Sequence, residues 1–548
     1  MKSGLQLDFS VPEQFNLASY ILEQNIQQGR GKRIALRCEG REDYTYNQLC
    51  ELTNRFGNVL KELGIQFQER ILLILSDSPE WIAGWFGGIK IGAVVAHHYS
   101  YLKPPDYEYL VNYVQPRFVV VDENTLPLVR DAVQKARFNV GLLVAGRHLP
   151  PLWPREYALN PQLEKASPKL EPYPTQRTDL AFWSFSGGTT GKPKGVPHTH
   201  HSLVYGAVAT QYLNKYTPDD IILRVPKLFF HYVRDNGMNW PMRQGASFII
   251  YPQKATPELI FELIAKYRPT VLDNVPTMMR AMVEHPLAQS ADLSCIRLSL
   301  ASGEPLSAQV TNDFRAAFGV ETLNTLGSAE SNIHHTIDQA GKIKPGSNGL
   351  IVPGVDIKIL DESANEVPQG ETGVMWVRSG ASGSYYFNDP EKSKISFPGD
   401  GWVNTSDLFR EDEDGYYWCM GRSDSMIKVS GVYVAPLEVE NCVEKHPGVS
   451  ECAVMGIKDR DDLAKAKVFI VLRPGFAPTQ DTALDIWDFC RSNIAPYKVP
   501  RTIEFLPQPL PKTGQGKIDR QQILKHQEND ESTFNETLAS AAAVAAGN

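Results

Sequence analysis

The chain has 548 residues, of which 42% are hydrophobic and 22% charged, and its formal net charge is −8. This length exceeds what one hydrophobic core supports, so we expect at least two domains. The acidic balance excludes the basic footprint of a protein that binds nucleic acid or an anionic membrane, and the sequence holds no apolar run of the roughly 18 residues that a membrane span requires.

The seven cysteines are widely spaced and form no Cys-x-x-Cys pair. Their odd number and spacing predict free thiols in a reducing compartment rather than a disulfide framework or a zinc site. The first residues, MKSGLQLDFSVPEQ, lack the apolar core of a secretory signal. We therefore expect a cytoplasmic protein.

Short apolar runs alternate with helix-like segments before Gly421, which is typical of an α/β fold whose helices cover parallel sheets. The strand–helix pairs, in chain order, are 71–75 with 79–92, 118–122 with 126–137, and 248–251 with 257–267. Residues 145–178 are rich in Pro and polar side chains, which predicts a surface connection rather than a core element.

The pattern changes after Gly421. Apolar runs at 454–457 and 468–472 and an amphipathic segment at 481–493 predict a small α+β domain. The last residues lack apolar periodicity and are expected to be disordered. We predict a large N-terminal domain over 1–423, a small C-terminal domain over 424–527 and a tail over 528–548.

Trp183 to His198 read WSFSGGTTGKPKGVPH, the most informative segment of the chain. The preceding apolar run fits a buried strand, and the loop after it is rich in glycine and hydroxyl side chains. Glycine lets backbone N–H groups approach an anion, while Lys192 and Lys194 add positive charge. The spacing and Pro193 exclude a Walker A loop. Taken by its composition alone, the segment is more simply an ordinary surface loop.

Further motifs in the chain favour a phosphate-binding loop. They are Leu326–Glu330, Trp402–Asp407, Gly421–Asp424 with Lys428–Gly431, and Pro511–Lys517. In this order the set resembles the acyl-adenylate-forming enzymes, which include acyl- and aryl-CoA ligases, luciferases and peptide-synthetase adenylation domains. The segments Phe15–Ala18, Tyr385–Lys392 and Ala495–Arg501 are most similar to benzoate-CoA ligases.

The resemblance implies an enzyme that activates an aryl acid with ATP and Mg²⁺ as acyl-AMP, releases pyrophosphate and transfers the acyl group to coenzyme A. Lys517 would be the catalytic lysine between the carboxylate and the α-phosphate. Asp424 would be the hinge of the small C-terminal α+β domain, which would be mobile. Glu330 would bind Mg²⁺, because Mg²⁺ takes carboxylate oxygen together with substrate phosphate. The CoA tunnel would include Lys428, Ser430 and Gly431.

The resemblance also implies the nucleotide site. Asp407 would accept hydrogen bonds from both ribose hydroxyls, with Arg422 as a second ribose contact. The remaining ATP- and AMP-binding residues would be Ser186, Gly187, Gly188, Thr189, Thr190, Lys194, Ser302, Gly303, Glu304, Asn324, Thr325, Leu326, Gly327 and Ser328. Two positions depart from the family. Ala329 stands where threonine is usual, a loss of about 1 kcal/mol for one neutral hydrogen bond, and Ser406 replaces a glycine.

The acid pocket would be walled by two segments of the chain. Its residues would be Phe230, His231, Tyr232, Gly327, Ile333 and His334. A neutral histidine offers one donor and one acceptor, so His231 could recognise a ring substituent. We therefore expect 2-aminobenzoate or 2-hydroxybenzoate ahead of benzoate. The adjacent His97 and His98 are expected to be ordinary loop residues.

Other functions stay open at this point. A stand-alone adenylation enzyme would load the thiol of a carrier protein instead of CoA. An ATP-binding regulatory protein without catalysis is disfavoured by Lys517, Glu330 and Asp407 and slightly favoured by Ala329. Nothing marks a site for luciferase-type oxygen chemistry. The sequence leaves a homodimer open, and we expect neither nucleic acid nor a membrane as a partner.

Overall fold

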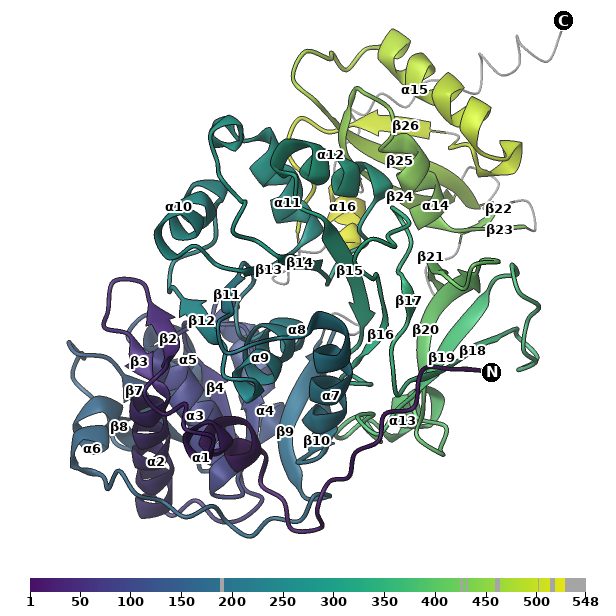
Figure 1. Cartoon of the computed structure of the whole chain (residues 1–548). Coiled ribbons are helices and arrows are strands. Elements are labelled where there is room, and N and C mark those ends of the chain that lie inside the picture. Colours follow the sequence, from purple (N-terminus) through teal and green to yellow (C-terminus); the bar gives the residue numbers. More distant parts are fainter. Residues whose placement is uncertain are drawn as a thin grey trace, which may run out of the picture. The chain divides into compact units, whose positions relative to one another are not determined.

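The computed structural model describes residues 1–187, 192–423, 427–429, 432–458, 464–500, 502–512 and 518–527 (Figure 1). The chain forms two compact units. Unit 1 comprises Met1–Lys358 and Trp376–Thr405, and unit 2 comprises Ile359–Met375 and Ser406–Asn548. The boundary at residues 423 and 424 stays a prediction, and the predicted disordered tail lies outside the described residues.

The first sheet of unit 1 has the strand order β10-β9-β5-β4-β6-β7-β8. Its strands are β4 (Arg70–Ile74), β5 (Val94–His97), β6 (Phe118–Asp122), β7 (Gly141–Ala145), β8 (Glu156–Ala158), β9 (Leu180–Ser186) and β10 (Lys194–Thr199). Its helices are α2 (Tyr46–Glu62), α3 (Pro79–Lys90), α4 (Pro104–Val114), α5 (Leu126–Gln134) and α6 (Leu159–Lys165).

Alternation along β4 explains why helices cover both faces of this sheet (Figure 1). Leu72 and Ile74 belong to the same core cluster as buried residues of α4 and α5. Ile71 and Leu73 point to the other face, where two glycines of α3 approach them closely. Because successive side chains of a strand point to opposite faces, one apolar run supplies both packing surfaces.

The second sheet of unit 1 has the order β17-β16-β15-β14-β13-β11-β12-β2-β3. Its strands are β2 (Ile34–Cys38), β3 (Tyr44–Thr45), β11 (Ile221–Arg224), β12 (Ser247–Ile250), β13 (Val271–Asn274), β14 (Leu298–Ala301), β15 (Thr322–Gly327), β16 (His334–Ile337) and β17 (Leu350–Ile351). Pairing is parallel from β2 to β15 and antiparallel for β16 and β17. Helices α10 (Pro257–Tyr267), α11 (Pro276–Glu284) and α12 (Ala308–Phe318) bury Phe261, Met279 and Phe314 in one core.

The remaining elements of unit 1 are short, apart from α7. They are β1 (Lys2–Ser3), a π-helix at Ser19–Glu23, α1 (Gln24–Gln27), α7 (Ser202–Asn214), α8 (His231–Arg234), a π-helix at Asp235–Asn239, α9 (Trp240–Arg243), a 3₁₀-helix at Pro286–Gln289 and α13 (Pro390–Ser396).

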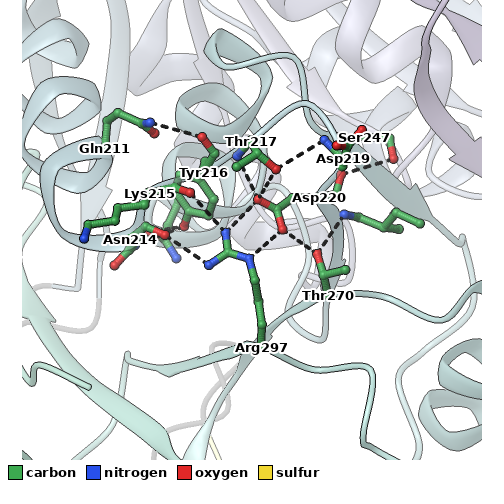
Figure 2. A network of polar contacts seen from close by, with 12 residues as sticks. Gln211, Asn214, Lys215, Tyr216, Thr217, Asp219, Asp220, Ser247, Thr270 and Arg297 are labelled. Carbon is green, nitrogen blue, oxygen red and sulfur yellow. Dashed lines mark hydrogen bonds and ion pairs between the residues drawn. The ribbon is translucent and has the colours of Figure 1, made fainter. Parts of the chain in front are cut away.

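A polar network joins the amino ends of three neighbouring parallel strands (Figure 2). Asp220, just before β11, accepts from Arg297 Nε at 2.7 Å and from Arg297 Nη2 at 2.6 Å. It also accepts from Thr270 Oγ1 at 2.6 Å and from Thr217 N at 2.8 Å. Since Thr270 precedes β13 and Arg297 precedes β14, the buried carboxylate holds these three strand starts together.

Unit 2 contains a small α+β domain. Its elements are β21 (Tyr417–Arg422), β22 (Ile427–Val429), β23 (Val432–Val434), α14 (Pro436–Val443), β24 (Val449–Lys458), β25 (Ala464–Leu472), α15 (Gln480–Asn493), a 3₁₀-helix at Pro496–Lys498, β26 (Thr502–Phe505) and α16 (Arg520–Gln527). Val439 and Ile486 bring α14 and α15 into one core with β24 and β25. Strands β18 (Asp356–Leu360), β19 (Gly373–Arg378) and β20 (Trp402–Glu411) each contain a unit boundary.

The fold class expected from the sequence is confirmed: a large α/β domain of sheets and helices precedes a smaller C-terminal domain, and all seven cysteines are free. The predicted strand–helix pairs are found within a few residues of their expected ends. The prediction for 145–178 was wrong in part, because β8 and α6 lie there. Leu159 and Leu163 are one helical turn apart and both buried, a periodicity that the surrounding Pro-rich sequence obscures. Among the described helices, none combines the length and apolar character needed to cross a bilayer.

Candidate active site

The predicted site residues of unit 1 gather where strands end. Ser186 is the last residue of β9, and Phe230–Tyr232 follow β11. Ser302–Glu304 follow β14, and Asn324–Gly327 form the end of β15. In open α/β sheets the carboxyl ends of parallel strands are where ligands bind, so this placement agrees with the sequence interpretation.

The predicted phosphate loop joins the two strands of a hairpin. Strands β9 and β10 are antiparallel, and Ser186 is the register partner of Lys194. Gly187 lies within the described residues, whereas Gly188, Thr189 and Thr190 lie outside them. A strand rather than a helix follows the loop, as expected for a loop that is not of the Walker A type.

Tyr386 connects this hairpin to the predicted metal ligand. Its hydroxyl donates to Glu330 Oε1 at 2.6 Å, and Ser186 interacts with the same hydroxyl. Burial first, and then the Glu330 carboxylate, raise the pKa of Tyr386, so the phenol stays protonated and remains a donor. Lys194 lies 5.6 Å from the centroid of the Tyr386 ring and forms a 3.1 Å ion pair with Asp389.

The turn between β15 and β16 is held by its own polar groups. Ser331 N donates to Ser328 Oγ at 3.3 Å, and the Ser331 hydroxyl also contacts His335 Nε2. His198 Nε2 lies 2.8 Å from the carbonyl oxygen of Ala329. Burial lowers the pKa of His198 to about 3, so the ring is neutral and this nitrogen carries the donated hydrogen. The side chain of Ala329 is itself buried.

The two predicted acid walls meet in unit 1. The rings of Tyr232 and His334 are 6.1 Å apart, and Trp240 packs edge-on against His334 at 5.4 Å. Tyr232 Oη, Trp240 Nε1 and both ring nitrogens of His334 are buried and have no hydrogen-bond partner among the residues that the structure describes. Burial lowers the pKa of His334 to about 4, which keeps the ring neutral. Ile333 is buried beside this group, whereas Phe230 pairs with Phe229 at 4.5 Å.

The backbone approaches closely at Gly327. A Cβ built on Gly327 would lie 2.8 Å from the carbonyl oxygen of Ile333, so a larger residue would push the end of β15 away from Ile333.

The residues predicted on the adenine side form one connected group. Ser302 Oγ donates to the Thr325 carbonyl at 2.8 Å, and Thr325 Oγ1 donates to the Ala301 carbonyl at 3.2 Å. Asn324 Nδ2 donates to the Ser347 carbonyl at 2.7 Å. Gly303 has φ +87° with open space at its Cβ position. Glu304 accepts from the Thr277 main chain at 3.2 Å and is therefore directed to α11.

In unit 2, the predicted ribose pair is in contact. Arg422 Nη1 lies 3.2 Å from Asp407 Oδ1, and both side chains are partly exposed. These residues are register partners on β20 and β21. Ser406, which replaces the usual glycine, has φ +58°, so the position requires the left-handed backbone that glycine adopts most easily.

Several predicted residues cannot be placed. Lys428 is the register partner of Tyr433 in the β22–β23 hairpin. The side chain of Lys428 lies outside the part of the chain that the structure describes. Lys517, Asp424, Ser430 and Gly431 lie outside the described residues. Their roles, like those of every site residue above, stay predictions.

Glu330 is a suitable ligand for a cation that is shared with substrate phosphates. The described residues contain no group of three or more His, Cys, Asp or Glu side chains arranged to hold a metal. A single carboxylate fits Mg²⁺, which usually takes one or two carboxylates and fills its other positions with phosphate and water.

Sequence reasoning missed a buried network around Arg234, and it was wrong about one histidine. His97 ends β5, is buried and contacts Arg234 Nη1 at 2.7 Å. It is not an ordinary loop residue. The sequence around His97-His98 and Arg234-Asp235 does not indicate this network, because its hydrogen bonds join segments that are far apart in the chain. Tyr386 could have been singled out, since it lies in the Tyr385–Lys392 segment that resembles benzoate-CoA ligases.

Comparison with known proteins defines the family. The model of the AMP-binding enzyme family matches residues 22–387, and that of the AMP-binding enzyme C-terminal domain matches residues 438–517. The chain therefore belongs to the AMP-binding enzyme family, as the motifs indicated.

Relatives within this family include CoA ligases for aromatic acids. The benzoate–CoA ligase of Thauera aromatica is 34% identical, over 93% of this chain and 96% of that protein. An anthranilate CoA ligase, solved with anthranoyl-AMP, is similar with a TM-score of 0.89 and 33% identity, over 95% of this chain and 98% of that one. A benzoate CoA ligase from Burkholderia xenovorans LB400 has a TM-score of 0.85 and 32% identity, over 93% and 99% of the two chains.

Proposed function

We propose that the protein is an ATP-dependent aryl-CoA ligase, an acid–thiol ligase that forms AMP. The acid carboxylate attacks the α-phosphate of ATP to give acyl-AMP and pyrophosphate. The thiolate of coenzyme A then attacks the acyl carbon and expels AMP. The observation that carries this proposal is that Ser186 and Glu330 both contact the Tyr386 hydroxyl. A residue of the predicted phosphate loop and the predicted Mg²⁺ ligand therefore lie next to each other.

The residue roles in this proposal follow the motifs. Lys517 binds the carboxylate and the α-phosphate during adenylation, and Asp407 with Arg422 binds the ribose. Glu330 would hold Mg²⁺, which would supply charge neutralisation at the phosphates. The C-terminal domain turns about Asp424 between the two steps. This rotation withdraws Lys517 and brings Lys428, Ser430 and Gly431 to the thiol.

The acid we propose is a benzoate with a polar ring substituent, with 2-aminobenzoate or 2-hydroxybenzoate first. Buried polar atoms are normally paired, because an unpaired one costs about 1–3 kcal/mol. Tyr232 Oη and the ring nitrogens of His334, in the predicted acid walls, are buried and lack partners among the described residues. An amino or hydroxyl group on the ring would satisfy such atoms, and plain benzoate would not.

Coenzyme A is the acceptor we favour over a carrier protein. The named relatives at 34% and 33% identity are CoA ligases. The carrier-protein alternative predicts that the acyl-AMP accumulates when only CoA is offered.

The test is a mass-spectrometric assay with ATP, Mg²⁺, CoA and a set of substituted benzoates and cyclic aliphatic acids. Formation of an aryl-CoA and AMP supports the proposal and identifies the acid. Aryl-AMP without thioester indicates a carrier protein, and no product from any acid contradicts the aryl-acid assignment. His231→Ala and His334→Ala then separate the two candidate readers of the substituent. The variant that equalises kcat/KM for benzoate and its 2-amino form identifies the reader, and no change in either would contradict the pocket.

A further inference from the structure

A single arginine in unit 1 connects elements that are far apart in the sequence. Arg234 ends α8 and its side chain is fully buried. Its Nε and Nη2 each donate to the Asp235 carboxylate at 2.7 Å. Nη1 lies 2.7 Å from His97 Nε2, and Nη2 also donates to Asn332 Oδ1 at 3.3 Å and to Ser184 Oγ at 3.4 Å.

Aromatic rings enclose the same guanidinium. The Arg234 Cζ atom lies 4.6 Å from the centroid of Trp85 and 4.5 Å from that of Phe182. Ring faces attract a cation, and they restrict the guanidinium to one plane. Trp85 Nε1 donates to Asn239 Oδ1 at 3.3 Å, and Asn239 Nδ2 donates to Asp235 Oδ1 at 2.9 Å, so the enclosure is itself hydrogen-bonded.

The charges of the network fix the direction of its hydrogen bonds. Burial first, and then Arg234, lower the pKa of His97 well below its ordinary value, so His97 is neutral. Arginine only donates, so His97 Nε2 is the acceptor and the ring hydrogen is on Nδ1. Burial raises the pKa of Asp235, and the Arg234 charge and hydrogen bonds oppose this shift. The carboxylate thus depends on Arg234 for its charge compensation.

The contacts of Arg234 end beside both predicted acid walls. His231 and Tyr232 belong to the same short helix. Asn332 directly precedes Ile333 and His334, and its φ of +49° is a left-handed conformation that requires support. Ser184 Oγ donates to the same Asn332 oxygen at 3.2 Å, so β9 is tied to the second wall as well.

We propose that Arg234 is a positioning residue for acid recognition: through Asn332 and its own helix it holds the two acid walls at a fixed separation. This inference rests on the proposed function. Arg234 touches no reacting atom in this scheme, and its effect on the acid comes through Asn332 and α8. A guanidinium is required because its rigid fork reaches Asp235, His97 and Asn332 at once, whereas a lysine ammonium is a single point charge.

Two substitutions test the two ends of this connection. Arg234→Lys keeps the charge beside Asp235 and removes the fork. Asn332→Gly removes the Oδ1 acceptor, tolerates the positive φ and leaves the buried ion pair intact, so it remains informative if Arg234→Lys fails to fold. The matched control is Arg130→Lys. Arg130 also binds a carboxylate with two nitrogens, donating to Glu156 at 2.9 Å and 2.7 Å, and stacks 4.4 Å from Trp153. Within the described part of the chain it has no recorded contact to a predicted site residue.

The readout is steady-state kinetics with benzoate and with its 2-, 3- and 4-substituted forms. We expect both Arg234→Lys and Asn332→Gly to raise the KM for the acid about tenfold, because small displacements in a binding site have effects of this order or larger. The KM for ATP should change less than about twofold, and selectivity among ring positions should decrease. The double variant should be no worse than Arg234→Lys alone, since both changes act through one contact.

Failure of the inference is distinguishable from failure of the proposed function. If the unmodified chain makes no aryl-CoA from any acid, the proposed function is wrong. If the unmodified chain is active, equal effects on the KM values for acid and ATP would overturn the positioning role. The same conclusion follows if the two substitutions are additive in the double variant, or if Arg130→Lys changes acid selectivity as strongly as Arg234→Lys does.

Discussion

Replacing Tyr386 by Phe would remove one hydroxyl and leave the ring in place, where it packs edge-on against Phe397 at 5.1 Å. The lost group is the donor that reaches Glu330 Oε1 at 2.6 Å. Because burial raises the pKa of Tyr386, the hydroxyl is a donor throughout the pH range of an assay. If Glu330 binds Mg²⁺, this hydroxyl fixes one carboxylate oxygen and directs the other to the ion.

The expected magnitude follows from that one contact. A hydrogen bond to a charged acceptor contributes about 1.5–3 kcal/mol. Glu330 is only partly buried, so water can replace the hydroxyl and the lower end of this range applies. Since about 1.4 kcal/mol is a factor of ten in an equilibrium constant, Tyr386→Phe should raise the Mg²⁺ concentration for half-maximal adenylation about tenfold.

The assay is pyrophosphate exchange into ATP, measured against Mg²⁺ concentration at saturating acid. Tyr107→Phe is the control, because Tyr107 is also buried in unit 1 and its hydroxyl bonds to the main chain of Leu102 at 3.0 Å, with no bond to Glu330. An unchanged Mg²⁺ requirement in Tyr386→Phe would refute the reasoning. An equal increase in Tyr107→Phe would show that the effect is general destabilisation.

Three further predictions concern other parts of the chain. Lys517→Ala should abolish pyrophosphate exchange and spare thioester formation from a supplied acyl-AMP; equal loss of both would contradict the division of labour. Asp424→Pro should reduce thioester formation more than adenylation, and a variant impaired in adenylation alone would exclude Asp424 as the hinge. Asp220→Asn should cost about 2–3 kcal/mol in urea unfolding at pH 7, because Arg297 would lose its buried partner but is itself partly exposed. Burial raises the pKa of Asp220, but the hydrogen bonds from Arg297, Thr270 and Thr217 outweigh burial, so the folded-state pKa is lowered. The stabilisation by the Asp220 carboxylate is therefore complete above the unfolded-state pKa of about 4, and it is lost as the pH falls through the lower folded-state pKa. A variant whose stability matches the unmodified chain at pH 7, or whose acid unfolding is unchanged, would contradict the role of Asp220.

The parallel strands of unit 1 and the helices on its sheets could be predicted from the sequence, because each apolar run of β4, β6 and β12 is short and is followed by a periodic segment. The motifs also predicted which residues of unit 1 would form the candidate site, and the fold brings these residues to the ends of strands, whereas their roles stay predictions. The exact strand neighbours could not be predicted, because non-local pairing leaves no pattern within one segment.

The Arg234 network could not be predicted from local sequence patterns. Arg234 is 137 residues from His97 and 98 residues from Asn332 in the chain, yet its guanidinium bonds to both. In the sequence, Arg234-Asp235 looks like an exposed charged pair, since such residues are rarely buried unless paired. Burial is possible only because the aromatic faces, the carboxylate and the neutral histidine come from separate elements that the fold assembles.

The acidic character of the chain bears on how it would attract ATP. Lys194 is already paired with Asp389 at 3.1 Å, and Lys192 lies 4.9 Å from the centroid of Tyr109. A partly exposed ion pair contributes only about 0–1 kcal/mol, so a polyphosphate that carries more charge than one carboxylate can take Lys194 from Asp389 at little cost. If Lys194 binds ATP, as predicted, Asp389 keeps it in place before ATP arrives without competing strongly with the nucleotide. In this chain of net charge −8, attraction for ATP would then come from a few placed cations and backbone amides, and not from the overall field.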